Sequence, residues 1–216
     1  MTRVIQIFTV VFFLLTSIVA FSQNNKQDFG TQVNLLFGLN QPLIDGFNIE
    51  GNIFHKRLVF DYSHGISLNF EGQSAAAVLT DAGLAAHLPY STGFGVGYRF
   101  TEWLNVRFEP KWHQFELYYE DDDAETPFAT YNTTTLGIGV YGMWKPFKNQ
   151  ENFLKGFMVA PSLRYWYNVG STLENDELTY FNTVTNQEEI HKALNIGVGN
   201  TPWIINVSIG YSVDLR

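Results

Sequence analysis

The chain of 216 residues contains no cysteine. Without a thiol it forms no disulfide framework, and it offers no cysteine for lipid attachment, so a lipoprotein is excluded. For the same reason, thiols give no indication of the redox compartment.

Basic residues are also scarce, and long apolar runs are absent after the N-terminus. Thirteen Lys and Arg stand against 21 Asp and Glu, and the formal net charge of −8 disfavours nucleic acid as a partner. No later segment is apolar for long enough to predict a transmembrane helix. The mean hydropathy of −0.07 is that of a soluble protein. A membrane barrel gives the same value, because the polar face of each strand offsets the apolar face.

One long apolar run does occur, at the N-terminus. Arg3 is followed by the uncharged segment Val4 to Ala20, and the small residues Ala20 and Ser22 precede a predicted cleavage site. We therefore predict a signal peptide over residues 1–22 and one domain over residues 23–216. The alternative is an uncleaved anchor, because about 17 apolar residues just suffice to span a bilayer.

The rest of the chain alternates apolar and polar residues with a period of two. In its last segment Ile205, Val207 and Ile209 alternate with Asn206 and Ser208. A strand that is apolar on one face and small or polar on the other is typical of a membrane β-barrel, with lipid outside and a polar lumen inside. Strands are predicted over residues 31–39, 47–54, 58–70, 91–100, 104–119, 131–144, 157–169 and 205–215.

This pattern predicts an all-β fold, a single antiparallel up-and-down transmembrane β-barrel of about eight strands. In the fifth strand the apolar face shifts to Phe115 and Leu117, which predicts a β-bulge near His113 and Gln114. Residues 71–90 and 171–201 are predicted as long external loops. Aromatic residues near strand ends suit the two interfacial girdles. These are Tyr90, Trp103, Tyr118, Tyr131, Trp144 and Trp203.

The N-terminal leader, the alternating strands and the final strand over residues 205–215 resemble the small outer-membrane barrels of Gram-negative bacteria. That group contains the OmpA transmembrane domain and the OmpX and OmpW types. The resemblance rests on pattern and implies a porin-like protein of the cell envelope, located in the cell outer membrane. Membrane lipid, lipopolysaccharide and the outer-membrane assembly machinery are the implied partners. We expect a monomer without a cofactor.

The sequence departs from that group in two respects. It ends on Asp214, Leu215 and Arg216, where many such barrels end on an aromatic residue, and this bears on recognition by the assembly machinery. We also expect no C-terminal peptidoglycan-binding domain.

The predicted inward faces carry four acids and four bases. A buried charge is tolerated only when it is paired and hydrogen-bonded, and an eight-stranded barrel has an interior that side chains just fill. We therefore predict an ion-pair network that closes the lumen. A gated or narrow path for small solutes is the alternative. The predicted network consists of Glu50, Asp61, Arg99, Arg107, Glu109, Lys111, Arg164 and Asp214.

A second candidate site is the small-apolar stretch over residues 75–88, which is unusual for an external loop. As a short helix it would cap the barrel mouth or dip into the outer leaflet. A hydrophobic funnel, as in the OmpW type, would make it the entrance for small apolar molecules. The plainer alternative is a loop helix that packs on its neighbours. The candidate entrance residues are Val78, Leu79, Leu84 and Leu88.

No catalytic residue is predicted. An outward His64 beside Ser63 suggests a lipid-A deacylase, whose site faces the outer leaflet. That family carries its Ser two residues after the His, where this chain has Ile66, and Ser63 is predicted to face the lumen. We therefore expect no enzymatic activity.

No metal site is predicted either. His87 and His191 lie in predicted loops at no metal-ligand spacing. The acidic clusters over residues 120–125 and 174–177 are interpreted as solvated loops, with loose divalent-cation bridging to lipopolysaccharide as the alternative.

Three functions remain open: a structural role, the passage or binding of small apolar molecules, and surface adhesion through the long loops. Adhesion would use a protruding hairpin formed by residues 178–184 and 190–198, whose edges can pair with foreign strands. The alternative fold is a soluble β-sandwich or lipocalin-like barrel. That fold would place apolar residues inside, whereas a membrane barrel would line its interior with Gly, Asn, Ser and Arg.

Overall fold

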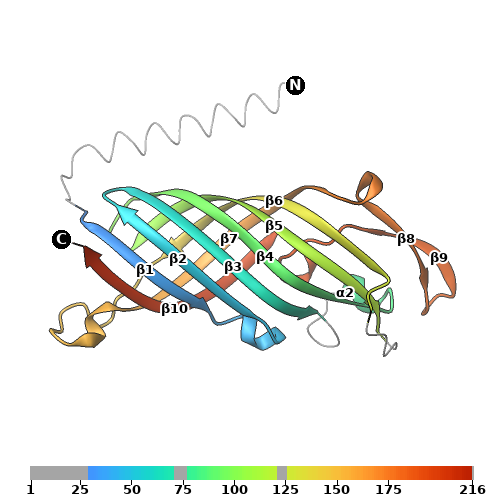
Figure 1. Ribbon diagram of the computed structural model, residues 1–216, viewed down its shortest axis with the longest axis horizontal. Helices are drawn as coiled ribbons and strands as arrows, with labels where there is room; N and C mark the ends of the chain where they lie inside the picture. Colours follow the sequence, from blue (N-terminus) through green and yellow to red (C-terminus); the bar gives the residue numbers. More distant parts are fainter. Residues whose placement is uncertain (1–28, 71–76, 121–125, 216) are drawn as a thin grey trace, which may run out of the picture.

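The computed structural model describes residues 29–70, 77–120 and 126–215. Eight strands close into an antiparallel barrel in the order β1-β10-β7-β6-β5-β4-β3-β2, which confirms the predicted fold class (Figure 1). Among the described residues, no helix has both the length and the apolarity needed to cross a membrane. The barrel strands are β1 (Thr31–Gly38), β2 (Phe47–His55), β3 (Leu58–Phe70), β4 (Leu84–Arg99), β5 (Leu104–Tyr119), β6 (Ala129–Gly142), β7 (Phe157–Ser171) and β10 (Trp203–Leu215).

The two ends of the barrel are built differently. The start of β1 and the end of β10 lie at one end, together with the β2–β3 and β4–β5 turns and the β6–β7 connection, which contains η3 (Phe153–Gly156) (Figure 1). We call this the lower end. The upper end carries η1 (Gln41–Ile44), α2 (Ala77–Thr80) and the connection from β7 to β10. The predicted signal peptide over residues 1–22 lies outside the described residues.

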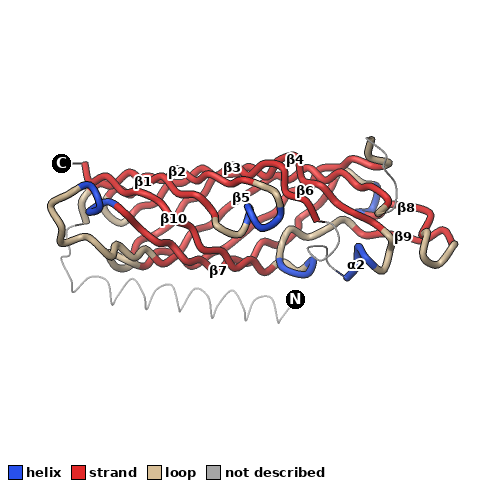
Figure 2. Tube along the Cα trace, turned by 90° about the horizontal axis from the view of Figure 1, so that it is seen from below, coloured by secondary structure: helices blue, strands red, loops and turns tan. Residues whose placement is uncertain are grey.

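The connection from β7 to β10 contains a separate two-stranded sheet, β8 (Glu177–Asn182) and β9 (Gln187–Lys192). This hairpin extends beyond the barrel at the upper end (Figure 2). The sequence predicts a hairpin in this segment, but its second arm ends at Lys192, so residues 193–198 are not part of it.

Apolar side chains cover the outside of the lower barrel. On β10, Ile205 and Tyr211 are 61% and 44% exposed, whereas Asn206 and Ser212 are buried. The alternation predicted for this strand is confirmed. The closed ring of strands excludes the soluble sandwich, and the polar lower lumen is the opposite of the apolar interior expected of a lipocalin-like barrel. Other exposed apolar side chains on the wall are Phe60, Tyr62, Phe94, Val96, Phe108, Ile138, Val140 and Leu163.

β5 contains no bulge at His113 and Gln114, so that prediction is wrong. Its pairing with β6 runs without a shift from Leu104 to Leu117. Phe115 and Leu117 continue the inward face and are buried. The chemistry of the inward face changes along β5 while the phase of the strand stays the same.

Two irregularities do occur, one on β4, which pairs with β5, and one on β3, the next strand along the barrel. The pairing of β4 with β5 shifts between His87 and Ser91. On β3, Ser67 has a φ of 56°, and the next residue, Leu68, points inward instead of outward as predicted. β4 also begins at Leu84, so the segment 84–90 is strand and not loop as predicted.

The outcome is a barrel wall whose polarity inverts with height on β4, β5 and β6. Above Trp112 the outward residues of β5 are Gln114, Glu116 and Tyr118, and the Tyr118 hydroxyl donates to Glu116. The residue of β6 that faces Gln114 is Asn132, which also points outward. Tyr131, predicted for an aromatic girdle, is buried inside. We call the part above this level the upper part. Its core consists of Leu68, Leu79, Ala82, Leu84, Ala86, Leu88, Phe115, Leu117, Tyr131, Tyr180 and Leu194.

Candidate functional site

The lower lumen is organised around Arg107, an inward residue of β5 with both acids of β2 and β3 within reach. Its Nη1 donates to Glu50 Oε1 and lies 3.3 Å from Asp61 Oδ2. Its Nε donates to Asn105 Oδ1 at 2.8 Å, and Asn52 Nδ2 donates to Glu50 at 2.9 Å. All five side chains are buried, so each charge depends on these contacts in place of water.

A second charged group lies one layer higher. Lys111 Nζ donates to Ser63 Oγ and is 4.0 Å from Glu109 Oε1. Glu109 also accepts a hydrogen bond from Trp166 Nε1 at 3.1 Å. His113 lies directly above, with Ser91 Oγ 2.8 Å from its Nδ1.

Aromatic rings separate the cations of the cluster. The Arg107 guanidinium lies 3.9 Å from the centroid of the Tyr141 ring, and Arg164 lies 5.2 Å from the same ring. Lys111 Nζ lies 4.6 Å from the Trp166 ring. Cation–π attraction therefore adds to the ion pairs and keeps three cations close together.

Glycines on β4 and β6 make room for these large side chains. A Cβ at Gly95 would overlap the Asp61 carboxylate, and one at Gly137 would overlap the Trp166 indole. Gly97 likewise faces Arg107, as the period-two glycines predict. Large side chains of one strand therefore fill the lumen by occupying the space next to glycines of the adjacent strand.

The structure brings six of the eight predicted network residues together. The other two lie at the lower end. Arg99 is buried but donates to the carbonyl oxygens of Thr101 and Glu102, and Asp214 is exposed and lies 3.6 Å from Lys145 Nζ. Asp214 lies near the end of β10, at the lower mouth of the barrel. The alternation of the strand predicts that Asp214 faces inward, but it does not predict this position along the barrel. The six residues are Glu50, Asp61, Arg107, Glu109, Lys111 and Arg164.

Three members of the cluster are not among the predicted site residues: Tyr141, Trp166 and Asn52. The sequence contains a signal for the two aromatic residues. Gly137 and Gly139 leave gaps on the inward face of β6, and a large inward ring on the same or the next strand is what fills them.

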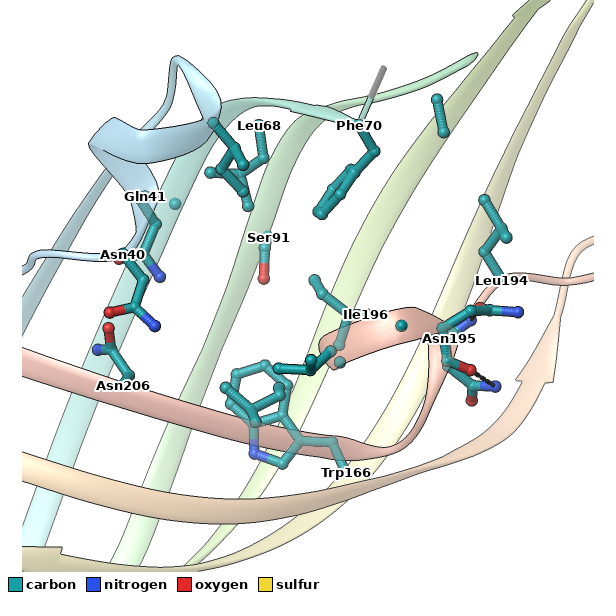
Figure 3. A pocket seen from close by; sticks show the side chains of 18 of the residues that line it. Asn40, Gln41, Leu68, Phe70, Ser91, Trp166, Leu194, Asn195, Ile196 and Asn206 are labelled. Carbon is teal, nitrogen blue, oxygen red and sulfur yellow. Dashed lines mark hydrogen bonds between the residues drawn. The ribbon is translucent and has the colours of Figure 1, made fainter. Parts of the chain in front are cut away.

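Above the charged cluster lies a cavity of about 260 Å³, which we call the upper chamber (Figure 3). Its floor is polar and includes Ser91, Lys111, Arg164 and Trp166. Apolar side chains make up most of the remaining lining, and Ile196 lies near Trp166. Six amide side chains also line the cavity: Asn40, Gln41, Asn48, Asn195, Asn200 and Asn206. The apolar lining consists of Ile44, Leu68, Phe70, Leu79, Ala86, Phe115, Leu194, Ile196, Val198, Ile204 and Ile205, together with the Trp166 ring.

The chamber extends to the seam between β1 and β10. The β1–β10 ladder ends where Gly38 faces Ser208, but β10 itself begins at Trp203. Above the ladder, Asn40 Nδ2 donates to the Ile205 carbonyl oxygen at 2.7 Å. Asn40 and Ile205 both line the chamber, so only a short polar contact separates its interior from the barrel wall at this point.

The four residues predicted to form an apolar entrance do not lie together in the structure. Leu79 lines the chamber, whereas Leu84 and Leu88 are buried in the core of the upper part and Val78 is 39% exposed. The predicted short helix exists as α2, but residues 71–76 lie outside the described residues.

The residues considered for catalysis do not form a site. Ser63 is buried in the lumen, and His64 lies on the opposite face of β3. In the part of the chain that the structure describes, no group of three or more His, Asp or Glu side chains is arranged to hold a metal ion. Most of the acidic cluster 120–125 is not described, and Asp176 accepts hydrogen bonds from Ser171.

The fold and its side chains define the class of protein: a closed eight-stranded barrel with an apolar exterior and a polar lumen, the architecture of an outer-membrane barrel. No protein-family model and no curated protein matches the chain.

The solved structures that are similar to it include the following two. The N-terminal β-barrel domain of Pseudomonas aeruginosa OprF is 13% identical with a TM-score of 0.39, covering 87% of this chain and 100% of that one. A major outer membrane protein from Thermus thermophilus is 12% identical with a TM-score of 0.41, covering 85% of this chain and 98% of that one.

Proposed function

We propose that this outer-membrane barrel binds a small, mainly apolar molecule in the upper chamber and that the charged cluster below closes the lumen. The chamber itself carries this proposal. It combines a mainly apolar lining with a few polar groups, and cavities of this kind are typical ligand sites.

The lining limits the size and chemistry of the ligand. A volume of about 260 Å³ lies just below the usual range of about 300–1,000 Å³ for ligand pockets, which favours a small molecule. Contact with Leu68, Phe70 and Phe115 stabilises an apolar body, because those side chains remove it from water. Lys111 and Arg164 at the floor favour a polar or anionic end.

We further propose that the ligand arrives from the membrane through the β1–β10 seam. Ile205 is exposed on the barrel wall, and Asn40 closes the gap by one side-chain hydrogen bond. Opening this contact costs far less than breaking a strand ladder, since one exposed hydrogen bond contributes about 1 kcal/mol.

The experiment fills the chamber and compares two substitutions of the same kind. Ala86 points into the chamber, and its neighbour Ala85 points outward on the same strand. Ala86→Phe is expected to abolish binding of a fluorescent apolar probe to the purified protein in neutral detergent, while Ala85→Phe leaves it unchanged. Both variants must keep the heat-modifiable migration of a folded barrel. Equal probe binding by the two variants would contradict the proposal.

The closed lumen has its own test, a planar bilayer recording. The charged cluster leaves no wide aqueous bore between the chamber and the lower end, so we expect the unmodified protein to show no steady conductance. Large, steady currents would contradict the proposal that the lumen is closed. They would not decide whether the upper chamber binds a ligand, which the probe experiment tests separately.

A second candidate function, surface adhesion, is favoured by the β8–β9 hairpin. Its outer face exposes Phe181 and Ile190, which are 47% and 64% accessible and lie diagonally across the two strands. Phe181→Ser with Ile190→Ser is expected to reduce attachment of whole cells to a partner surface. Unchanged attachment would remove this candidate.

A further inference from the structure

The lower mouth of the barrel contains a second cavity, of about 500 Å³, far from the upper chamber. Phe29, Trp103, Met143 and Trp144 contribute its apolar lining. Four of its lining residues are basic and two are acidic: Arg99, Lys145, Lys148 and Lys155 against Glu102 and Asp214. This cavity therefore carries a net charge of +2 in a chain whose formal net charge is −8.

Arg99, which lines this cavity, has one nitrogen without a hydrogen-bond partner among the described residues. The residue is only 3% exposed, and its Nε and Nη2 donate to the carbonyl oxygens of Thr101 and Glu102. Its Nη1 is buried, and no hydrogen-bond acceptor for it exists among the described residues. A buried guanidinium nitrogen without an acceptor is costly, and because Arg99 lines the cavity, an anionic oxygen bound beside this nitrogen would lower that cost.

The lysines around the cavity are only partly neutralised. Lys145 Nζ is 3.6 Å from Asp214, and Lys148 Nζ is 3.7 Å from Glu102. Within the described residues, Lys155 forms no ion pair with an acidic group. Burial lowers the pKa of Lys145, and a bound anion would offset that effect.

We infer that the lower mouth binds a phosphate group, held by Arg99 together with Lys145 and Lys155. A guanidinium matches the oxygens of phosphate with parallel hydrogen bonds, and ammonium groups add charge without a fixed geometry. The site is distinct from the upper chamber and does not depend on its function.

The surroundings indicate two sources for the phosphate. Trp103 and Trp144 are 59% and 64% exposed at this end, and exposed Trp side chains are typical of the membrane interface, where phospholipid headgroups lie. An anionic phospholipid is therefore one source, and a soluble phosphate from the aqueous side is the other. Both present anionic phosphate oxygens to the cavity.

The experiment uses the folded full-length mature protein in neutral detergent. Inorganic phosphate is titrated while tryptophan fluorescence is recorded, because Trp103 and Trp144 line the cavity. In parallel, native mass spectrometry counts phosphatidylglycerol retained from mixed micelles relative to phosphatidylcholine. The test variant is Lys145→Glu with Lys155→Glu. The control, Lys56→Glu with Lys192→Glu, makes the same change of charge outside the cavity.

We expect the test variant to weaken binding about tenfold in whichever arm detects it, and the control to match the unmodified protein. Arg99→Gln should have the same effect, and the lysine variant keeps the test valid if Arg99→Gln fails to fold. Retention of phosphatidylglycerol alone supports the site with lipid as the source, and phosphate binding alone supports it with a soluble source. Absence of both, or equal loss in the control, would overturn the inference.

Discussion

The lower and upper parts of this barrel share strands but have opposite polarity. In the lower part, β5 exposes Phe108 on the wall and buries Arg107 and Glu109 in the lumen. In the upper part, the same strand turns polar residues outward and buries Phe115 and Leu117. The lower part is therefore built for lipid and the upper part resembles a soluble barrel with an apolar core.

The length of β5 explains the change. A tilted strand needs about 9–11 residues to cross the hydrocarbon core. The segment from Leu104 to Trp112 covers nine residues of a strand that continues to Tyr119. The remaining residues extend into water, where an apolar interior is the stable arrangement. The upper chamber lies at the boundary between these two environments.

The largest effect is expected from the lower part. Arg107→Met leaves Glu50 and Asp61 buried without their shared cation, which should lower the free energy of unfolding by about 3–5 kcal/mol. Urea unfolding in lipid vesicles, followed by tryptophan fluorescence, measures this. Lys192→Ala, an exposed cation of the hairpin, is the control and should have almost no effect. A cost below about 1 kcal/mol for Arg107→Met would contradict the ion-pair network.

A smaller effect is expected from the glycines that make the lower lumen compact. Gly137→Ala should cost about 1–3 kcal/mol, because the added methyl group overlaps the Trp166 indole. Gly51→Ala is the matched control, since no atom lies within 4 Å of the position that its Cβ would take and the residue is also on the barrel wall. Similar unfolding midpoints for the two variants would show that the lumen is not closely packed.

The smallest effect is a dependence of the stability of the upper part on pH. Burial lowers the pKa of His191 in β9, so the unfolded chain takes up a proton at a higher pH than the folded chain does. The stability contribution is present above a pH of about 6.5, the value for an unperturbed His, and is lost as the pH falls. His191→Gln should reduce the acid sensitivity of hairpin proteolysis, and His55→Gln, exposed at the lower end, should not. Identical pH profiles for all three proteins would contradict this.

The same comparison explains what the sequence predicts and where it misleads. The lower strands are predictable because apolar residues face lipid on every second position, and six network residues follow from the inward phase. A rule that equates an apolar residue with contact to lipid assigns Phe115 and Leu117 to the wall. Above the membrane that rule reverses. The sequence alone does not reveal the height at which a strand leaves the bilayer.

The positions of Arg99 and Asp214 require the three-dimensional structure for a different reason. Both follow the inward phase of their strands, but they lie at the strand ends, where the lumen opens. The alternation of apolar and polar residues predicts which face of a strand a residue is on, but it does not predict how far along the barrel axis the residue lies. The packing of the β6–β7 connection at the lower mouth, which brings Lys145 to Asp214, depends on a long-range contact with no local signal.

The inversion of polarity is tested most directly by spin labels placed along β5 in a lipid bilayer. The chain has no native cysteine, so single-cysteine variants at Phe108, Gln114, Phe115 and Leu117 can be labelled without background. Oxygen should reach position 108 from the lipid, a water-soluble nickel reagent should reach position 114, and neither should reach positions 115 and 117. Strong oxygen collision at positions 115 and 117 would place them on the lipid face and contradict the inverted upper part.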